Sequence, residues 1–221
     1  MIRPRLLGHR GARGDKSVPE NTLASFDLAL TQGCDGFEFD VRLAGDGQAV
    51  ISHDATTASH RLKIAESSAR GLELPLLSDV LTRYQRDAFL DIELKVRGLE
   101  KITADLLRRI APARGCVVTS FLPEVLRTMH GRDAGIRLGL ICETRAQLGL
   151  WTDLPVAYVI PHFSLLRRSL ITELKDAGRK VMVWTVNVTA DMKRFAKWGV
   201  DGIISDHPAR LARALGRQGK T

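Results

Sequence analysis

The sequence predicts a (β/α)8 TIM barrel of the α/β class, formed by a single domain that spans residues 1–221. About eight short apolar runs alternate with segments of helical periodicity, a pattern typical of a mostly parallel sheet with helices outside it. Eight such units in 221 residues suit a compact barrel. No linker or low-complexity segment divides the chain. An open doubly wound sheet is the alternative, but "GHRGARG" lacks the GxGxxG spacing that would favour it.

The first half of the chain begins with the apolar run "LLGH" and then changes to helical spacing. Leu23, Phe26 and Leu30 share one helix face, and Gly33 is a stop signal. Two extended runs follow, and "AGDG" between them predicts a hairpin turn. In order, the expected elements are a strand at 6–9, a helix at 20–33, strands at 35–43 and 48–53, a helix at 75–85, a strand at 88–96 and a helix at 99–111.

The second half repeats the strand–helix unit without interruption. Each apolar run is followed by a segment of helical period, and this repetition indicates parallel strands joined by helices. In order, the expected elements are a strand at 115–121, a helix at 123–131, a strand at 136–142, a short helix at 144–151, a strand at 156–163, a helix at 165–178, a strand at 180–187, a helix at 189–199, a strand at 200–206 and a helix at 207–218.

Composition and charge limit which binding partners and which cellular location are expected. The formal net charge is +8, and the excess arginine favours a small anionic substrate. No basic stripe with interleaved aromatic residues is present, so a nucleic-acid partner is not expected. Three widely spaced cysteines without a CxxC pair disfavour a disulfide framework and a cysteine zinc site. We expect no transmembrane segment, and a cytoplasmic location because the N-terminus lacks an apolar run of signal-peptide length.

Two of the predicted strands carry acids on one face. In "GFEFDVRL", Glu38 and Asp40 share a face, while the alternate aromatic and apolar residues share the other. In "DIELK", Asp91, Glu93 and Lys95 are likewise on one face. Buried carboxylates of like charge require a positive partner.

The candidates for that partner are Lys95, Arg10 and a divalent metal. Oxygen ligands favour a hard ion, Mg²⁺ or Ca²⁺. A purely structural salt-bridge network is the alternative. The acids lie toward the carboxyl ends of their strands, where barrel active sites are built. His9 and His53 also end strands, and histidine exchanges protons near neutral pH.

These residues stand in motifs that resemble the glycerophosphodiester phosphodiesterase family. The N-terminal signature is "GHRGARG…VPENTLASFDLAL…GFEFDVRL…DGQAVISHD". The resemblance continues through "PLLSDVL", "DIELK", "VWTVN" and "GVDGIISDHP", so it extends from His9 to about Pro208. Taken together, the motifs are specific, although no single one is.

The resemblance implies a (β/α)8 barrel that uses one divalent cation, Mg²⁺ or Ca²⁺, to hydrolyse glycerophosphodiesters to an alcohol and sn-glycerol 3-phosphate. Lysophospholipase D activity on lipid substrates and a non-catalytic barrel that binds a phosphorylated ligand are the alternatives. The residues that correspond by motif position are Glu38, Asp40 and Glu93 as metal ligands, His9 and His53 as the acid–base pair, Arg10 and Lys95 at the phosphate, and Trp184 at the glycerol pocket.

The chain departs from this family in the segment between His53 and Pro75. The family has a longer segment there, with a small subdomain, so we expect a barrel without the usual insertion. Without that subdomain, we expect the leaving alcohol to have no cover from this chain, and a partner subunit in a homodimer is one way to supply the cover.

Of the remaining polar residues, Asp206 is expected to cap a helix and 19–21 to start the first helix. Ser120 and Asn187 are open candidates for site contact, and His60, His130, His162 and His207 are expected to be structural or exposed.

Overall fold

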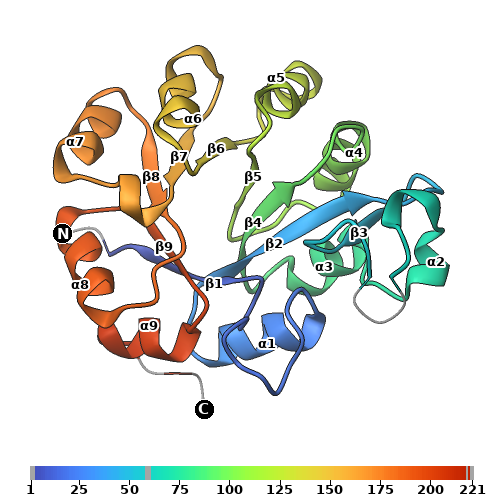
Figure 1. Ribbon diagram of the computed structural model, residues 1–221, viewed down its shortest axis with the longest axis horizontal. Helices are drawn as coiled ribbons and strands as arrows, with labels where there is room; N and C mark the ends of the chain where they lie inside the picture. The colour runs from blue at the N-terminus through green and yellow to red at the C-terminus, as the bar shows by residue number, and fades with distance from the viewer. Residues whose placement is uncertain (1–2, 58–60, 218, 220–221) are drawn as a thin grey trace.

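The computed structural model describes residues 3–57, 61–217 and 219, and it shows a closed barrel of parallel strands (Figure 1). The barrel strands are β1 (Arg5–His9), β2 (Gly36–Leu43), β4 (Phe89–Leu94), β5 (Cys116–Ser120), β6 (Leu138–Cys142), β7 (Tyr158–Pro161), β8 (Lys180–Val183) and β9 (Gly202–Ser205). Strand β1 pairs in parallel with both β2 and β9, which closes the ring. The predicted barrel is therefore confirmed, and the open doubly wound alternative is wrong.

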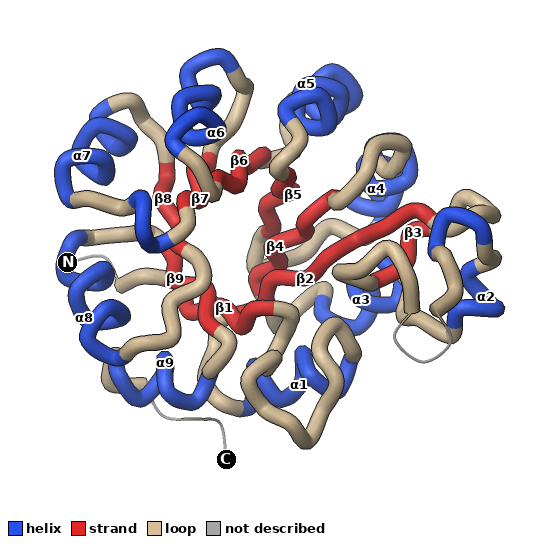
Figure 2. The backbone as a smooth tube through the Cα atoms, viewed as in Figure 1, coloured by secondary structure: helices blue, strands red, loops and turns tan. Residues whose placement is uncertain are grey.

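Helices surround the ring of strands, as the tube in Figure 2 shows. They are α1 (Leu23–Thr31), α2 (Ala69–Leu72), α3 (Leu77–Tyr84), α4 (Glu100–Arg109), α5 (Pro123–Arg132), α6 (Arg145–Gly149), α7 (Arg168–Asp176), α8 (Thr189–Trp198) and α9 (Pro208–Ala214). Within the described part of the chain, no helix combines the length and apolar character needed to span a bilayer.

The strands separate two apolar cores. The outward faces of the strands pack under the helices, and there Phe37 stacks on Phe26 with 4.2 Å between ring centroids. A smaller cluster that includes Leu7, Val117 and Ile204 fills the inside of the barrel. Because Leu7 belongs to this inner cluster, the alternation along β1 also turns His9 inward. The inner apolar layer therefore forms a floor beneath the inward polar residues.

The segment between β2 and α3 leaves the ring of strands. Strand β3 (Ala49–Ile51) pairs antiparallel with β2, which confirms the predicted hairpin. Between β3 and α3, the described residues, 52–57 and 61–76, form a 3-10 turn at Ile64–Glu66 and the one-turn helix α2. Ile64 and Leu72 pack on Val50 in a small separate apolar cluster. We call these residues, 52–57 and 61–76, the excursion. Figure 1 shows it beside β2, outside the barrel.

Candidate active site

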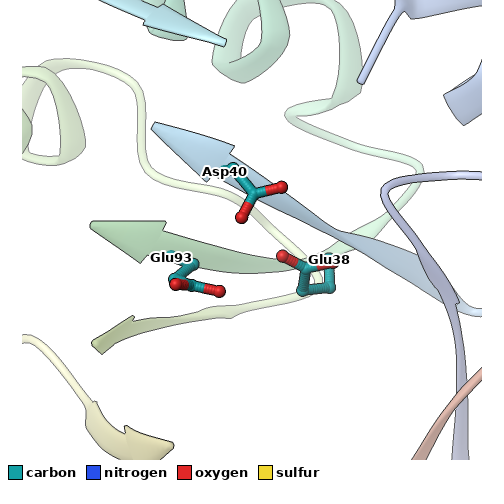
Figure 3. Close-up of side chains that lie close together, drawn as sticks. All are labelled: Glu38, Asp40 and Glu93. Carbon is teal, nitrogen blue, oxygen red and sulfur yellow. The ribbon is translucent and has the colours of Figure 1, made fainter. Parts of the chain in front are cut away.

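Three carboxylates from two neighbouring strands converge at the centre of the barrel mouth. Glu38 and Asp40 come from β2, and Glu93 comes from β4, whose register places it opposite Asp40. One oxygen from each of the three lies within 4.8 Å of the others. All three side chains are buried. Figure 3 shows their carboxylates turned toward one another. The predicted acidic ligand set is thus assembled in one place.

Two protein cations lie against this acidic cluster. The Lys95 Nζ atom is 2.6 Å from Glu93 Oε1 and 3.2 Å from Asp40 Oδ1. The Arg10 Nε atom is 3.2 Å from Asp40 Oδ2. Burial works to raise the pKa of Asp40, but Lys95 and Arg10 outweigh it and hold that pKa below its ordinary value. Asp40 is therefore the best-neutralised acid of the three.

The other two acids are neutralised less completely by the protein's own cations. Burial, reinforced by Asp40 and Glu93, raises the pKa of Glu38 well above its ordinary value. Burial and Asp40 likewise raise the pKa of Glu93 to about 7. One Glu38 oxygen accepts a hydrogen bond from the Arg10 backbone N–H at 2.9 Å, but Oε1 has no hydrogen-bond partner among the described residues. An unpaired buried oxygen within an all-oxygen cluster fits a hard divalent cation.

The loop after β1 holds two residues of the site in left-handed backbone conformations. Arg10 has φ 50° and Asn21 has φ 57°, a region that non-glycine residues seldom adopt. Asn21 is buried, and its Nδ2 donates to Asp40 Oδ2 at 2.9 Å. Such local strain persists where the surroundings impose it, as in functional sites. Residues 19–21 therefore do not start α1, because Thr22 is its N-cap and Asn21 supports the acidic cluster.

His9 is held by an acidic residue from the last strand of the barrel. Its Nδ1 is 2.7 Å from Asp206 Oδ1, and Asn187 Nδ2 donates to the other oxygen of Asp206 at 2.6 Å. Burial works to raise the pKa of Asp206, but His9, Asn187 and Arg13 together outweigh it and keep the pKa below its ordinary value. With Nδ1 engaged, Nε2 of His9 faces Glu38 at 3.8 Å. The predicted capping role of Asp206 is wrong, because His207 is the N-cap of α9.

His53 follows β3, which pairs with β2, as does β1, the strand that ends at His9. Its Nδ1 is 2.8 Å from Asp54 Oδ1, and Arg42 Nε donates to its carbonyl oxygen at 2.8 Å. The side chain is 35% exposed, against 11% for His9. The two histidines therefore differ in access to solvent, while each engages a carboxylate through Nδ1.

A cavity of about 300 Å³ joins these groups. All predicted site residues except Asp40, which lies behind them, line it. One wall is charged and the opposite wall is apolar, where the Trp184 and Phe121 rings meet edge to face at 5.6 Å. The lining residues are His9, Arg10, Glu38, His53, Asp91, Glu93, Lys95, Phe121, Ile141, Glu143, Ile160, Trp184 and Ile204.

The site also includes acids outside the predicted ligand set. Asp91 lies in register with Glu38 and accepts a hydrogen bond from Thr119 at 2.8 Å. Burial raises the pKa of Asp91 to about 7, and Glu93 adds to the rise against the Thr119 hydrogen bond. Glu143 lines the cavity from the end of β6. The inward phase of "DIELK" indicated Asp91, but no feature of the sequence indicated Glu143.

The remaining polar candidates divide between the site and the scaffold. Asn187 belongs to the site through Asp206. Ser120 belongs to the scaffold, because its hydroxyl donates to the Leu94 carbonyl. The ring of His162 lies 5.3 Å from that of Trp184 and is partly exposed. His60 lies outside the described residues.

Comparison with known proteins agrees with this geometry. Residues 9–67 and 58–210 match the model of the glycerophosphoryl diester phosphodiesterase family. A glycerophosphodiester phosphodiesterase of Caldanaerobacter subterraneus is 29% identical, with 97% of this chain and 98% of that protein aligned. The alignment covers 246 residues, more than the 221 of this chain, so that relative carries insertions.

Two further similarities concern structure and substrate. A phosphodiesterase of Oleispira antarctica, solved in complex with the product sn-glycerol-3-phosphate, superposes with a TM-score of 0.86 and is 26% identical, with 97% of each chain covered. A lysophospholipase D of Mus musculus is 23% identical, with 97% of this chain and 82% of that protein aligned.

Proposed function

Because the chain belongs to the glycerophosphoryl diester phosphodiesterase family, we propose that it hydrolyses glycerophosphodiesters to sn-glycerol 3-phosphate and an alcohol. Family membership makes the chain a phosphoric diester hydrolase and disfavours a non-catalytic ligand-binding barrel. The observation that carries the proposal is the location of His9 and His53 on the lining of one cavity with Glu38 and Glu93.

Glu38, Asp40 and Glu93 would hold one divalent cation. The unpaired Glu38 oxygen and the excess of acid over protein cation support this assignment. A bound divalent cation supplies Lewis-acid stabilisation of phosphate charge. The oxygen ligands accommodate Mg²⁺ and Ca²⁺ alike.

Arg10 and Lys95 are the protein groups that would bind the phosphate. Both line the cavity next to the acidic cluster, and the side chains of both are mostly buried. Fixed positive groups in such a site stabilise charge that develops in the transition state. These cations pair with Asp40 and Glu93, so phosphate and metal binding would redistribute these ion pairs.

His9 would act as the general base and His53 as the general acid. Asp206 engages Nδ1 of His9, so Nε2 is the atom free to take a proton near the acidic cluster. That proton comes from the nucleophile as its oxygen bonds to phosphorus, either water itself or the glycerol 2-hydroxyl, whose cyclic phosphate water then opens. Nδ1 of His53 is engaged by Asp54, which leaves its Nε2 to deliver a proton to the departing alcohol oxygen as the P–O bond breaks. The greater exposure of His53 supports its assignment to the side where the alcohol leaves.

Trp184 would line the glycerol end of the cavity. Its Nε1 donates to the Ile160 carbonyl at 3.0 Å, which orients the indole ring beside Phe121. This apolar wall also favours a second candidate, lysophospholipase D activity, because an acyl chain on the glycerol would find apolar contacts there. The similarity to lysophospholipases D supports testing lipid substrates as well.

The test is product analysis with glycerophosphocholine before and after dialysis against EDTA. We expect release of choline and glycerol 3-phosphate, loss of activity after dialysis, and recovery on addition of Mg²⁺ or Ca²⁺. Lysophosphatidylcholine tests the second candidate in the same assay. Full activity after exhaustive removal of metal would reject the metal role, and absence of both products from the metal-loaded protein would reject the activity.

A further inference from the structure

A second hollow adjoins the cavity and meets it at His53. This groove has a volume of about 610 Å³, and His53 is the residue common to both linings. Its described lining residues are Pro19, Glu20, Asn21, Thr22, Ile51, Ser52, His53, Asp54, Thr56, Thr57, Gly71, Leu72, Glu73, Leu74 and Pro75. One wall is therefore the loop before α1, and the other is the short excursion after β3.

One side chain, that of Asn21, connects the groove to the acidic cluster. Asn21 lines the groove, and its side chain donates to Asp40. A phosphate held at the cluster therefore lies beside the groove as well as inside the cavity. The substrate carries two substituents on its phosphorus, and the cavity and the groove are two separate hollows that share His53 in their linings.

We propose that the alcohol leaving group occupies this groove and that the groove favours an alcohol with positive charge, of the choline or ethanolamine type. The inference rests on the proposed function and adds the alcohol-binding subsite to it. The glycerol phosphate arm enters the cavity of about 300 Å³, and the other arm passes His53 into the larger groove. The general acid then lies beside the oxygen that leaves.

The charge of the groove supports this preference. Three carboxylates line it, and none of its described lining residues is Lys or Arg. Glu20 is engaged by Arg10 and Arg13, and Asp54 is engaged by His53.

Glu73, by contrast, makes no side-chain hydrogen bond or ion pair that the described part of the structure records. It follows α2 with φ 54°. Glu73 is thus the carboxylate available to a cationic ligand.

The decisive experiment compares kcat/KM for glycerophosphocholine and glycerophosphoglycerol, which differ in the charge of the alcohol. Glu73→Lys reverses the charge at position 73 and should lower the choline-to-glycerol ratio of kcat/KM by about three- to tenfold, because the charges are solvent-exposed. Glu73→Gln should lower it less. Glu66→Lys is the matched control, because Glu66 lies in the same excursion, is exposed and does not line the groove.

A second variant tests the path of the alcohol. Thr56→Trp places a large ring in the groove and should lower kcat/KM for glycerophosphocholine by about tenfold, while hydrolysis of glycerol 3-phosphate methyl ester stays near the wild-type rate. That small ester also reports whether each variant is folded. An unchanged choline-to-glycerol ratio in Glu73→Lys, or equal losses on both esters in Thr56→Trp, would overturn the inference alone. If the wild-type enzyme cleaves none of these diesters, the proposed function itself fails.

Discussion

The two histidines occupy unlike environments for one reaction. His9 is nearly buried and bonded to Asp206, whereas His53 is partly exposed and bonded to Asp54. His9→Ala and His53→Ala should each lower kcat by about 10²–10⁴-fold, the range for a general acid or base. The effects should be far from additive in the double variant.

Leaving-group quality separates the roles of the histidines. An activated p-nitrophenyl diester needs little protonation of its leaving oxygen, so it should partly restore the rate of His53→Ala but not that of His9→Ala. The measurement is kcat on the activated and natural diesters for both variants. Equal restoration would reject this division of roles and leave the hydrolysis itself standing.

Asp206 is the residue whose importance only the structure shows. Its two oxygens together contact Nδ1 of His9, Nδ2 of Asn187 and a guanidinium nitrogen of Arg13. An asparagine has one acceptor oxygen, so Asp206→Asn cannot satisfy His9 and Asn187 together. We expect kcat to fall by about 10²-fold or more with little change in KM, because the effect is on proton transfer rather than binding.

The matched control for that variant is Asp201→Asn. Asp201 accepts a hydrogen bond from Val181 and lies near Lys175, away from the cavity. It should lose stability without a comparable loss of kcat in the folded protein. If Asp206→Asn keeps its kcat while its melting temperature falls, Asp206 is only structural.

At the scale of the strand, β2 places adjacent residues in opposite environments. Phe37 packs outward among aromatic rings, and Glu38 points into the acidic cluster. Phe37→Ala should reduce the free energy of unfolding by about 3–5 kcal/mol, because it empties a fully buried site. Glu38→Gln should leave the metal-free protein as stable or more stable, because it removes a buried like charge.

Urea unfolding in EDTA measures both variants on the same scale. Addition of Mg²⁺ or Ca²⁺ should then stabilise Phe37→Ala as it does the wild type, but should not stabilise Glu38→Gln. If Glu38→Gln loses as much stability as Phe37→Ala in EDTA, the acidic cluster is a structural network rather than a site for a cation.

The β2–β4 pairing also explains why these two strands carry the acids. Gly36 begins β2 so close to β4 that an added Cβ would lie 1.8 Å from the Phe89 carbonyl oxygen. This contact sets the register that brings Asp40 opposite Glu93. Glycine at position 36 is therefore a steric requirement of the site, although it lies far below the cavity mouth.

At the scale of the whole molecule, the acidic cluster makes stability depend on pH and on metal. The pKa of Glu93 is raised from its ordinary 4.5 to about 7, so the folded metal-free protein binds this proton more tightly than the unfolded chain does. Stability from this group is present below about pH 4.5 and is lost as pH rises through about 7. Asp91, raised to about 7, acts in the same direction.

We therefore expect the increase in melting temperature caused by a divalent cation to grow between pH 5 and pH 8. A cation competes with protons for the same carboxylates and removes the repulsion that destabilises the ionised cluster. For a chain of this size, each kcal/mol corresponds to about 2–4 °C. Calorimetry with EDTA and with Ca²⁺ at several pH values measures this increment. An increment independent of pH would contradict the assignment.

We also propose that the chain unfolds as one domain, because β1 and β9 close the ring from opposite ends of the chain. A single calorimetric transition is then expected.

The homodimer stays a prediction, and light scattering of the purified protein measures its molar mass in solution.

The sequence alone determined what depends on local period and order. Alternation of strands and helices predicted the barrel, and the two-residue period of a strand separated Glu38 and Asp40 from Phe37 and Phe39. The same period placed Glu93 on an inward face, strand ends placed His9 and His53 at the same rim, and the family resemblance suggested the role of each residue. Such inferences are possible from sequence because strand phase and motif spacing are properties of short segments.

Tertiary structure alone decided the contacts that depend on closure of the barrel. His9 and Asp206 are 197 residues apart and meet because β1 pairs with β9. Asn21 looked like part of a helix start, but the left-handed turn of its loop directs it to Asp40. The groove beside His53 likewise exists only where the loop before α1 faces the excursion after β3. Local propensity carries no information about these long-range contacts, because the path of the chain around the barrel determines them.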